Sequence, residues 1–135
     1  MVYVTRRERF SAAHRLFKPG LSDEENFELF GLCSNPNWHG HNYILEVIVK
    51  GDIDPETGFL LDLKDLKEII RKNVIEKVDH KNLNIDTDFM KGILPSSENI
   101  TIAIWKQLVN KIPKGKLHSV KLYETENNYF EYKGE

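Results

Sequence analysis

The sequence predicts an α+β domain in which two helices cover one face of a four-stranded antiparallel sheet. Apolar residues recur with a period of two near both ends of the chain and with a helical period between them, so the order is strand, strand, helix, helix, strand, strand. The two outer pairs of strands are hairpin-like, and hairpins favour antiparallel pairing. A length of 135 residues fits one domain, which we place at residues 1–135.

The first two strands are predicted at residues 2–16 and 39–51. Strict alternation in the second strand places one set of side chains on a single face: His39, His41, Tyr43, Leu45, Val47 and Val49. The connection between the strands, residues 17–38, is irregular apart from a short helix at 23–30. That helix has acidic residues in its first turn, where they complement the helix dipole.

Two helices and two strands are predicted in the rest of the chain. Residues 62–78 have the spacing of an amphipathic helix, and residues 97–111 form a second helix with a serine as its N-cap. Strands at 117–125 and 128–133 follow, around an asparagine turn. Because the sheet face away from the helices also carries apolar residues, we expect another subunit to cover it.

Composition and charge exclude several classes of partner. A net charge of −2 indicates no basic face for nucleic acid or for an anionic membrane. No apolar run approaches the ~20 residues of a membrane span, and the first residues do not resemble a secretion signal. A single cysteine, Cys33, cannot form an internal disulfide, which suits a reducing compartment. We therefore expect a cytoplasmic protein.

A His-x-His pair at the start of the second strand indicates a metal site. His39 and His41 point to the same side, with Cα atoms roughly 6.6 Å apart. Such a pair alone is more often structural, but His14 on the neighbouring strand supplies a third imidazole. Three neutral histidines leave the fourth position of a tetrahedral zinc ion open. The sequence therefore predicts Zn²⁺ at His14, His39 and His41.

Cys33 lies in a polar turn close to this group, and the residues alone leave its role open. As a fourth ligand it would close the site and make it structural. As a base beside the metal it would serve catalysis, since a nearby cation favours the thiolate. A free cysteine is also often just a small buried side chain, although the polar turn argues against that.

Motifs along almost the whole chain resemble the 6-pyruvoyl-tetrahydropterin synthase family. They are Phe10–Leu16 (FSAAHRL), Cys33–Tyr43 (CSNPNWHGHNY), Leu60–Leu66, Asp79–Leu83, Ser96–Asn99 and Tyr123–Asn128. The resemblance implies the tunnelling fold, in which three subunits join their sheets into a barrel. It also implies a homohexamer made of two stacked trimers.

The resemblance also implies a role for each matching residue. Zinc ligands would be His14, His39 and His41, and the catalytic residues would be Cys33, Asp79, His80 and Glu124. The Asp79–His80 pair would come from a neighbouring subunit. Substrate-binding residues would be Glu124, which anchors the pterin, together with Ser96, Ser97 and Glu98.

The implied activity is that of a zinc-dependent carbon–oxygen lyase of tetrahydrobiopterin biosynthesis. It would convert 7,8-dihydroneopterin 3′-triphosphate to 6-pyruvoyl-5,6,7,8-tetrahydropterin and triphosphate. Glu124 suits its role because it shares a strand face with apolar Val120 and Leu122, where a solvated carboxylate would be out of place. The residues that hold the triphosphate stay unassigned, although Arg15, Lys18 and Lys81 lie near the motifs.

Three alternative functions remain. A 6-carboxytetrahydropterin synthase of queuosine biosynthesis uses the same substrate, but five residues separate Cys33 from His39 here, whereas that type generally has three. A zinc hydratase or hydrolase would also use three histidines and would not need Cys33. A non-catalytic pterin-binding or zinc-stabilised module would unfold when its metal is removed.

Overall fold

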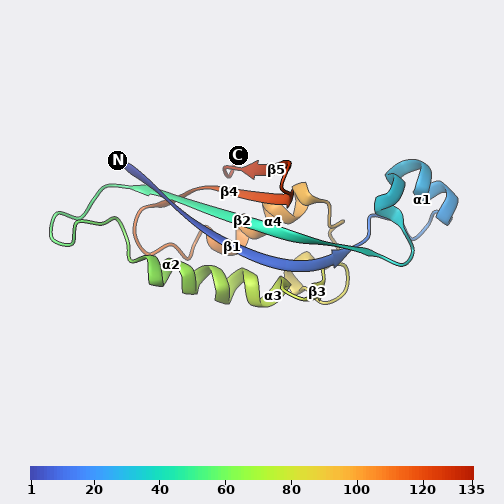
Figure 1. Ribbon diagram of the computed structural model, residues 1–135, viewed down its shortest axis with the longest axis horizontal. Coiled ribbons are helices and arrows are strands. Elements are labelled where there is room, and N and C mark those ends of the chain that lie inside the picture. The colour runs from blue at the N-terminus through green and yellow to red at the C-terminus, as the bar shows by residue number, and fades with distance from the viewer.

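The computed structural model describes residues 1–135, which form one five-stranded sheet with helices against one face (Figure 1). The strands, in the spatial order β3-β1-β2-β4-β5, are β1 (Val2–His14), β2 (His39–Gly51), β3 (Lys81–Asn82), β4 (Lys116–Thr125) and β5 (Asn128–Tyr132). The four long strands are antiparallel, as predicted, and the α+β class is confirmed. Strand β3, which pairs in parallel with β1, was not predicted, because two residues are too few to show an alternation of apolar and polar side chains.

The helices follow the predicted order; the first has the predicted bounds, and the later ones differ in detail. They are α1 (Asp23–Phe30), α2 (Leu63–Ile70), α3 (Glu76–Val78) and α4 (Ser97–Leu108), with a π-helical turn at Arg71–Ile75 that joins α2 to α3. The helix predicted at 62–78 is therefore continuous but locally widened. The second helix ends at Leu108, before the predicted position 111, because the residues directly after Leu108 are exposed and have no apolar face to bury.

Side chains from one face of β2 form the centre of the core. Tyr43, Leu45, Val47 and Val49 are fully buried, which confirms the predicted alternation. They belong to one hydrophobic cluster with the inner faces of the helices: Leu66, Ile70, Val74, Val78, Ile100, Ile104 and Leu108. Burial of these side chains, at ~25 cal/mol per Å² of apolar area, is the main stabilisation of the helix layer.

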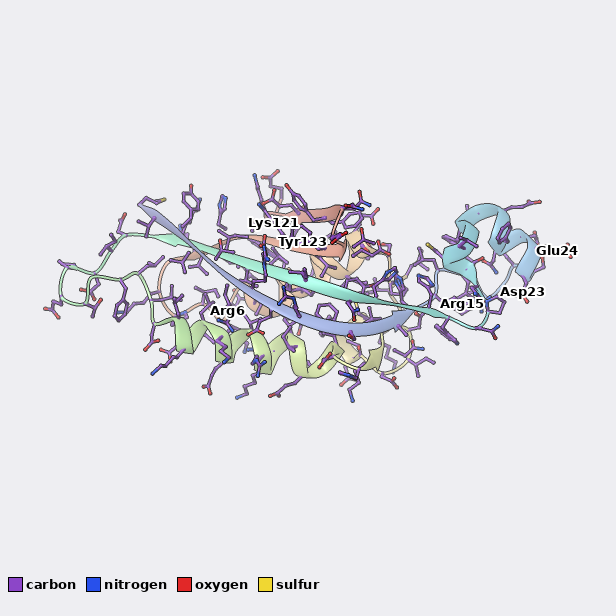
Figure 2. The ribbon with its side chains drawn as sticks, viewed as in Figure 1. Arg6, Arg15, Asp23, Glu24, Lys121 and Tyr123 are labelled. Carbon is purple, nitrogen blue, oxygen red and sulfur yellow. The ribbon has the colours of Figure 1, made fainter.

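The opposite face of the sheet is not covered by any helix of this chain. It carries an ion pair between Arg7 Nη2 and Glu46 Oε2 at 2.7 Å, and the Lys121 ammonium lies 5.3 Å from the Tyr129 ring. Figure 2 labels Lys121 and Tyr123 on this part of β4. Apolar Ile44 also points to this face. The face therefore carries both apolar and charged side chains, whereas the sequence predicted only its apolar residues.

One end of the sheet is extended by the connection between β1 and β2. Helix α1 and the 3₁₀ turn Gly31–Ser34 project beyond the ends of these two strands (Figure 1). The end of β1 pairs in register with the start of β2, so that His14 lies opposite His39 and Ala12 opposite His41. This pairing brings the predicted metal ligands together beside the turn that holds Cys33. No helix is long and apolar enough to cross a membrane.

Candidate metal centre and active site

Three histidine rings meet at the junction of β1 and β2. The ring centroid of His14 lies 4.5 Å from that of His39 and 5.1 Å from that of His41, and the latter two are 5.0 Å apart. Possible ligand atoms of these histidines and of Glu124 all lie within 4.8 Å of one another. These four residues, His14, His39, His41 and Glu124, are called the metal group below. The register of β1 and β2 brings its three histidines together, although they come from separate parts of the sequence.

One nitrogen of each histidine is buried and has no hydrogen-bond partner: Nε2 of His14, Nδ1 of His39 and Nε2 of His41. The tautomer of His14 follows from its other nitrogen, which lies 2.7 Å from the carbonyl oxygen of Pro95. Since a carbonyl can only accept, Nδ1 carries the proton and Nε2 presents a lone pair to the group. An unsatisfied buried polar atom costs about 1–3 kcal/mol, so three of them in one place fit a bound metal ion.

Burial also favours the neutral, metal-binding state of the His14 and His39 rings. It lowers the pKa of His14, and the neighbouring His39 and His41 lower it further, against opposing effects of Pro95 and Glu124. The pKa of His39 is lowered by burial and by His41. Neutral imidazole is the form that coordinates a metal. The chemistry of the group thus suits a divalent ion.

Glu124, near the end of β4, is the fourth member of the group. Its Oε1 lies 2.9 Å from Nε2 of His41 and 3.8 Å from Nε2 of His14, although neither nitrogen has a hydrogen-bond partner. Its Oε2 accepts a 2.8 Å hydrogen bond from the Ser97 hydroxyl. The carboxylate lies on the strand face of buried Val120 and Leu122, as the sequence indicated, but its contact with the histidines was not predicted.

The predicted substrate-binding residues at the start of α4 separate into different positions. Ser97 is buried and oriented toward Glu124. The Ser96 hydroxyl instead accepts a hydrogen bond of 3.2 Å from the Asn99 N–H, so this serine is the N-cap of the helix. Glu98 is exposed in the first turn of α4 and does not join the group.

Cys33 is half-buried in the 3₁₀ turn Gly31–Ser34, and its sulfur is not among the possible ligand atoms of the group. The pKa of its thiol is raised by burial and then by the negative charge of Glu124. The backbone of Leu16 donates a hydrogen bond of 2.8 Å to the Cys33 carbonyl. The turn is therefore tied to the segment that directly follows His14.

Asp79 and His80 form a pair at the end of α3 that lies apart from the three histidines. His80 Nδ1 is 3.0 Å from Asp79 Oδ1, and the His80 side chain is 83% exposed. Asp79 Oδ1 also accepts a hydrogen bond from the Ser11 N–H at 2.9 Å, and this bond, with His80, lowers the Asp79 pKa. His80 lines a surface groove together with Ser11 and Asn42, and His41 of the histidine group also lines this groove.

Comparison with known proteins identifies the family. A family model described as 6-pyruvoyl tetrahydropterin synthase matches residues 3–135. The chain belongs to this family. It is 50% identical over 132 residues to the 6-pyruvoyl tetrahydrobiopterin synthase of Pongo abelii, covering 98% of this chain and 91% of that protein. The corresponding protein of Dictyostelium discoideum is 47% identical over 134 residues, covering 99% and 97%.

A solved structure supports the same assignment at the level of the fold. The 6-pyruvoyl tetrahydropterin synthase of Caenorhabditis elegans superimposes with a TM-score of 0.91 at 42% identity, covering 99% of this chain and 96% of that one. Membership of the 6-pyruvoyl tetrahydropterin synthase family confirms the predicted resemblance, fold and enzyme class.

Two residues near the site were missed or read differently in the sequence. Pro95 contributes only its carbonyl, and no side-chain pattern marks a carbonyl acceptor. Tyr43 was placed correctly on the histidine face, but no role at the site was predicted for it. Its ring stacks on Phe10 with centroids 4.8 Å apart and lies edge-on to His41 at 5.5 Å, while its buried hydroxyl has no partner. A tyrosine two positions after His-x-His was the available signal.

Proposed function

We propose that this chain is a zinc-dependent lyase of tetrahydrobiopterin biosynthesis. It converts 7,8-dihydroneopterin 3′-triphosphate to 6-pyruvoyl-5,6,7,8-tetrahydropterin and triphosphate. The observation that carries the proposal is the convergence of three unpartnered histidine nitrogens beside a half-buried cysteine, in a chain of this family. We further propose that residues 1–135 act as one catalytic domain in the cytoplasm.

The three histidines are the zinc ligands in this proposal. His14 Nε2, His39 Nδ1 and His41 Nε2 are the buried lone pairs available to the ion. Three imidazoles leave one position of a tetrahedral Zn²⁺ open for the substrate. The ion, when bound, withdraws electron density from the side-chain oxygens of the substrate and so acidifies the neighbouring C–H bonds.

Cys33 serves as the base that takes the side-chain proton at Sγ. Its sulfur lies outside the ligand group, which supports the role of base over that of fourth ligand. In the metal-free protein, burial and Glu124 keep the thiol protonated by raising its pKa. A divalent cation nearby opposes both effects and favours the thiolate. The site therefore activates its base only when it is loaded.

Glu124 and Ser97 bind the pterin ring. The amino group and ring N–H of a pterin form a flat pair of donors, and a carboxylate accepts such a pair with both oxygens. Ser97 donates to Oε2 and thereby restricts the rotation of the carboxylate. Of the residues predicted to bind substrate, these two carry the proposal, whereas Ser96 caps α4 and Glu98 is exposed in its first turn.

His80 exchanges protons with the reacting side chain, and Asp79 orients it. Because Nδ1 of His80 is turned toward Asp79, Nε2 is left for proton transfer. The His80 side chain is 83% exposed, and neither member of the pair joins the metal group of its own chain. We therefore propose that a neighbouring subunit supplies it, within a homohexamer built as two trimers.

Incubation of the zinc-loaded protein with dihydroneopterin triphosphate tests the activity. We expect release of triphosphate and formation of the pyruvoyl product. Recovery of carboxytetrahydropterin and acetaldehyde would instead assign the chain to the queuosine type. Removal of zinc should abolish turnover and leave most of the fold intact, whereas global unfolding would favour a zinc-stabilised binding module.

The Cys33→Ala variant tests the chemistry of the site. We expect kcat to fall by about 10²–10⁴, the usual contribution of a general base, with unchanged zinc content. Full turnover of this variant would favour a zinc hydratase or hydrolase, since that chemistry has no need of the thiol.

A further inference from the structure

Arg15 follows the metal-group residue His14 directly, and its side chain is not solvated. Only 12% of it is exposed. Its guanidinium lies 4.0 Å from the centroid of the Phe17 ring, a cation–π contact that fixes the plane of the group. Figure 2 shows Arg15 and Asp23 side by side at the base of α1, where Nη2 of Arg15 lies 3.2 Å from Asp23 Oδ1.

Nε of the Arg15 side chain reaches the turn that holds Cys33. Arg15 Nε donates a hydrogen bond of 2.8 Å to the carbonyl of Ser34. The next residue, Leu16, donates through its backbone N–H to the carbonyl of Cys33 at 2.8 Å. Two consecutive residues after His14 therefore hold two consecutive carbonyls of the turn.

The backbone of Arg15 is itself held in place. Its N–H donates to Oδ1 of Asn84 at 2.9 Å, and its carbonyl accepts from Nδ2 of the same side chain at 2.9 Å. Ser34, which receives the Nε bond, is 3% exposed and closes the turn with its hydroxyl on the Gly31 carbonyl. Hydrogen bonds therefore fix both ends of the contact between Arg15 and the turn: Asn84 holds the backbone of Arg15, and the Ser34 hydroxyl holds the turn.

We propose that Arg15 is a positioning residue that sets the place of Cys33 relative to the metal group, and that it is not a ligand of the triphosphate. The inference rests on the proposed role of Cys33 as base. Nε, one N–H of Nη2 and one face of the guanidinium are engaged within the chain, and only 12% of the side chain is exposed, so contacts inside the chain fix its orientation. A misplacement of the base by about 1 Å can lower a rate by about 10²-fold.

Replacement by glutamine and by lysine separates geometry from charge. In Arg15→Gln the side-chain nitrogen is bonded to Cδ, like Nε of arginine, so a neutral donor to the Ser34 carbonyl is retained. In Arg15→Lys the charge is retained but that donor is lost. We expect kcat of the Gln variant to exceed that of the Lys variant by about tenfold, the effect of one hydrogen bond, with KM nearly unchanged in both.

Alkylation of Cys33 by iodoacetamide in the metal-free protein gives a readout that does not require catalysis. We expect faster alkylation in Arg15→Lys than in the wild type or Arg15→Gln, because the turn is released. Asp23→Asn is the matched control: it removes only the outer ion pair and should leave kcat and alkylation within about twofold. Thermal unfolding of each variant reports the stability of the fold.

Two results would overturn the inference. If Lys restores activity better than Gln, and KM rises in the Gln variant, the charge of Arg15 binds the triphosphate. If both variants lose kcat, stability and thiol protection equally, Arg15 is a general structural residue. If the Arg15→Lys variant does not fold, Asn84→Ala takes its place. We expect Asn84→Ala to lower kcat at constant KM, and a wild-type kcat in this variant would contradict the positioning role.

If Cys33→Ala retains turnover, the proposed function fails. The alkylation rates would still show whether Arg15 holds the turn that carries Cys33.

Discussion

At the scale of single residues, burial and the Glu124 carboxylate together influence the Cys33 thiol. The thiol is half-buried, and the carboxylate adds a negative charge to its surroundings. Both effects disfavour the thiolate and raise the pKa of Cys33 in the metal-free protein. In the proposed function, a cation held by the three histidines would oppose both effects and favour the thiolate.

The pH dependence of Cys33 alkylation tests this coupling. In the metal-free wild type we expect the midpoint to lie above the ordinary cysteine pKa, because burial and Glu124 both raise it. In Glu124→Gln the midpoint should fall, since the negative charge is gone and only burial remains. Zinc should lower the midpoint of the wild type. Iodoacetamide rate constants across a pH series measure all three.

Glu98→Gln provides the control for that experiment. It removes an exposed carboxylate that does not join the metal group, so the alkylation midpoint should match that of the wild type. An equal shift in both Gln variants would mean that net charge, and not the proximity of Glu124, governs the thiol.

At the scale of elements, the start of α4 combines a structural and a functional hydroxyl in adjacent positions. Ser96 caps the helix through the Asn99 N–H, while Ser97 donates to Glu124. The sequence shows two serines before a helical pattern and cannot say which one turns toward the sheet. The distinction depends on how α4 lies against β4.

Substitution of the two serines should therefore give opposite results. Ser96→Ala should lower the free energy of unfolding by about 1 kcal/mol, the usual value of an N-cap, with little effect on KM. Ser97→Ala should raise KM for the pterin substrate, because Glu124 loses the hydroxyl that restrains it. Chemical denaturation and steady-state kinetics measure the two effects. A KM increase in Ser96→Ala alone would reverse the assignment.

Regular elements could be predicted because their patterns are long. More buried and less buried positions alternate from His39 to Val47 in the thirteen-residue strand β2, and this pattern reveals the histidine face at the same time. Irregular features gave no such signal. The π-helical turn Arg71–Ile75 shifts the helix by a single residue, which an amphipathic pattern tolerates, and β3 depends on a pairing with Ala12 and Ala13.

Much of the site could be predicted from motifs, and what remained depends on tertiary contacts. Alternation alone placed His39 and His41 together, and the strand pair explains His14. The family resemblance supplied roles for Asp79, His80 and Glu124. The hydrogen bond from His14 to the Pro95 carbonyl, and the approach of Glu124 to the histidines, arise only when α4 and β4 are folded against β1 and β2.

At the scale of the whole molecule, the chain keeps His80 apart from the metal group. The ligand atoms of His14, His39, His41 and Glu124 converge, whereas His80 is 83% exposed and does not belong to that group. The charged and aromatic residues of the uncovered face suit a wet interface or channel better than a dry one. The proposed function therefore requires that His80 of a second copy completes the site.

Complementation between inactive chains tests the shared site. Cys33→Ala and His80→Ala should each be inactive as homo-oligomers. Co-expressed in equal amounts, they should regain about a quarter of wild-type activity, because that share of sites receives Cys33 from one variant and His80 from the other. Turnover assays on the mixed oligomer measure this. Mixed oligomers without activity would place both residues in the same chain's site.

The coordination of zinc in the loaded protein tests the central claim most directly. X-ray absorption, with a crystal structure at the zinc edge, should find nitrogen atoms of His14, His39 and His41 at about 2.0–2.1 Å, and the Cys33 sulfur outside the coordination sphere. A zinc–sulfur distance of about 2.3 Å, or an ion bound without one of these histidines, would contradict the account.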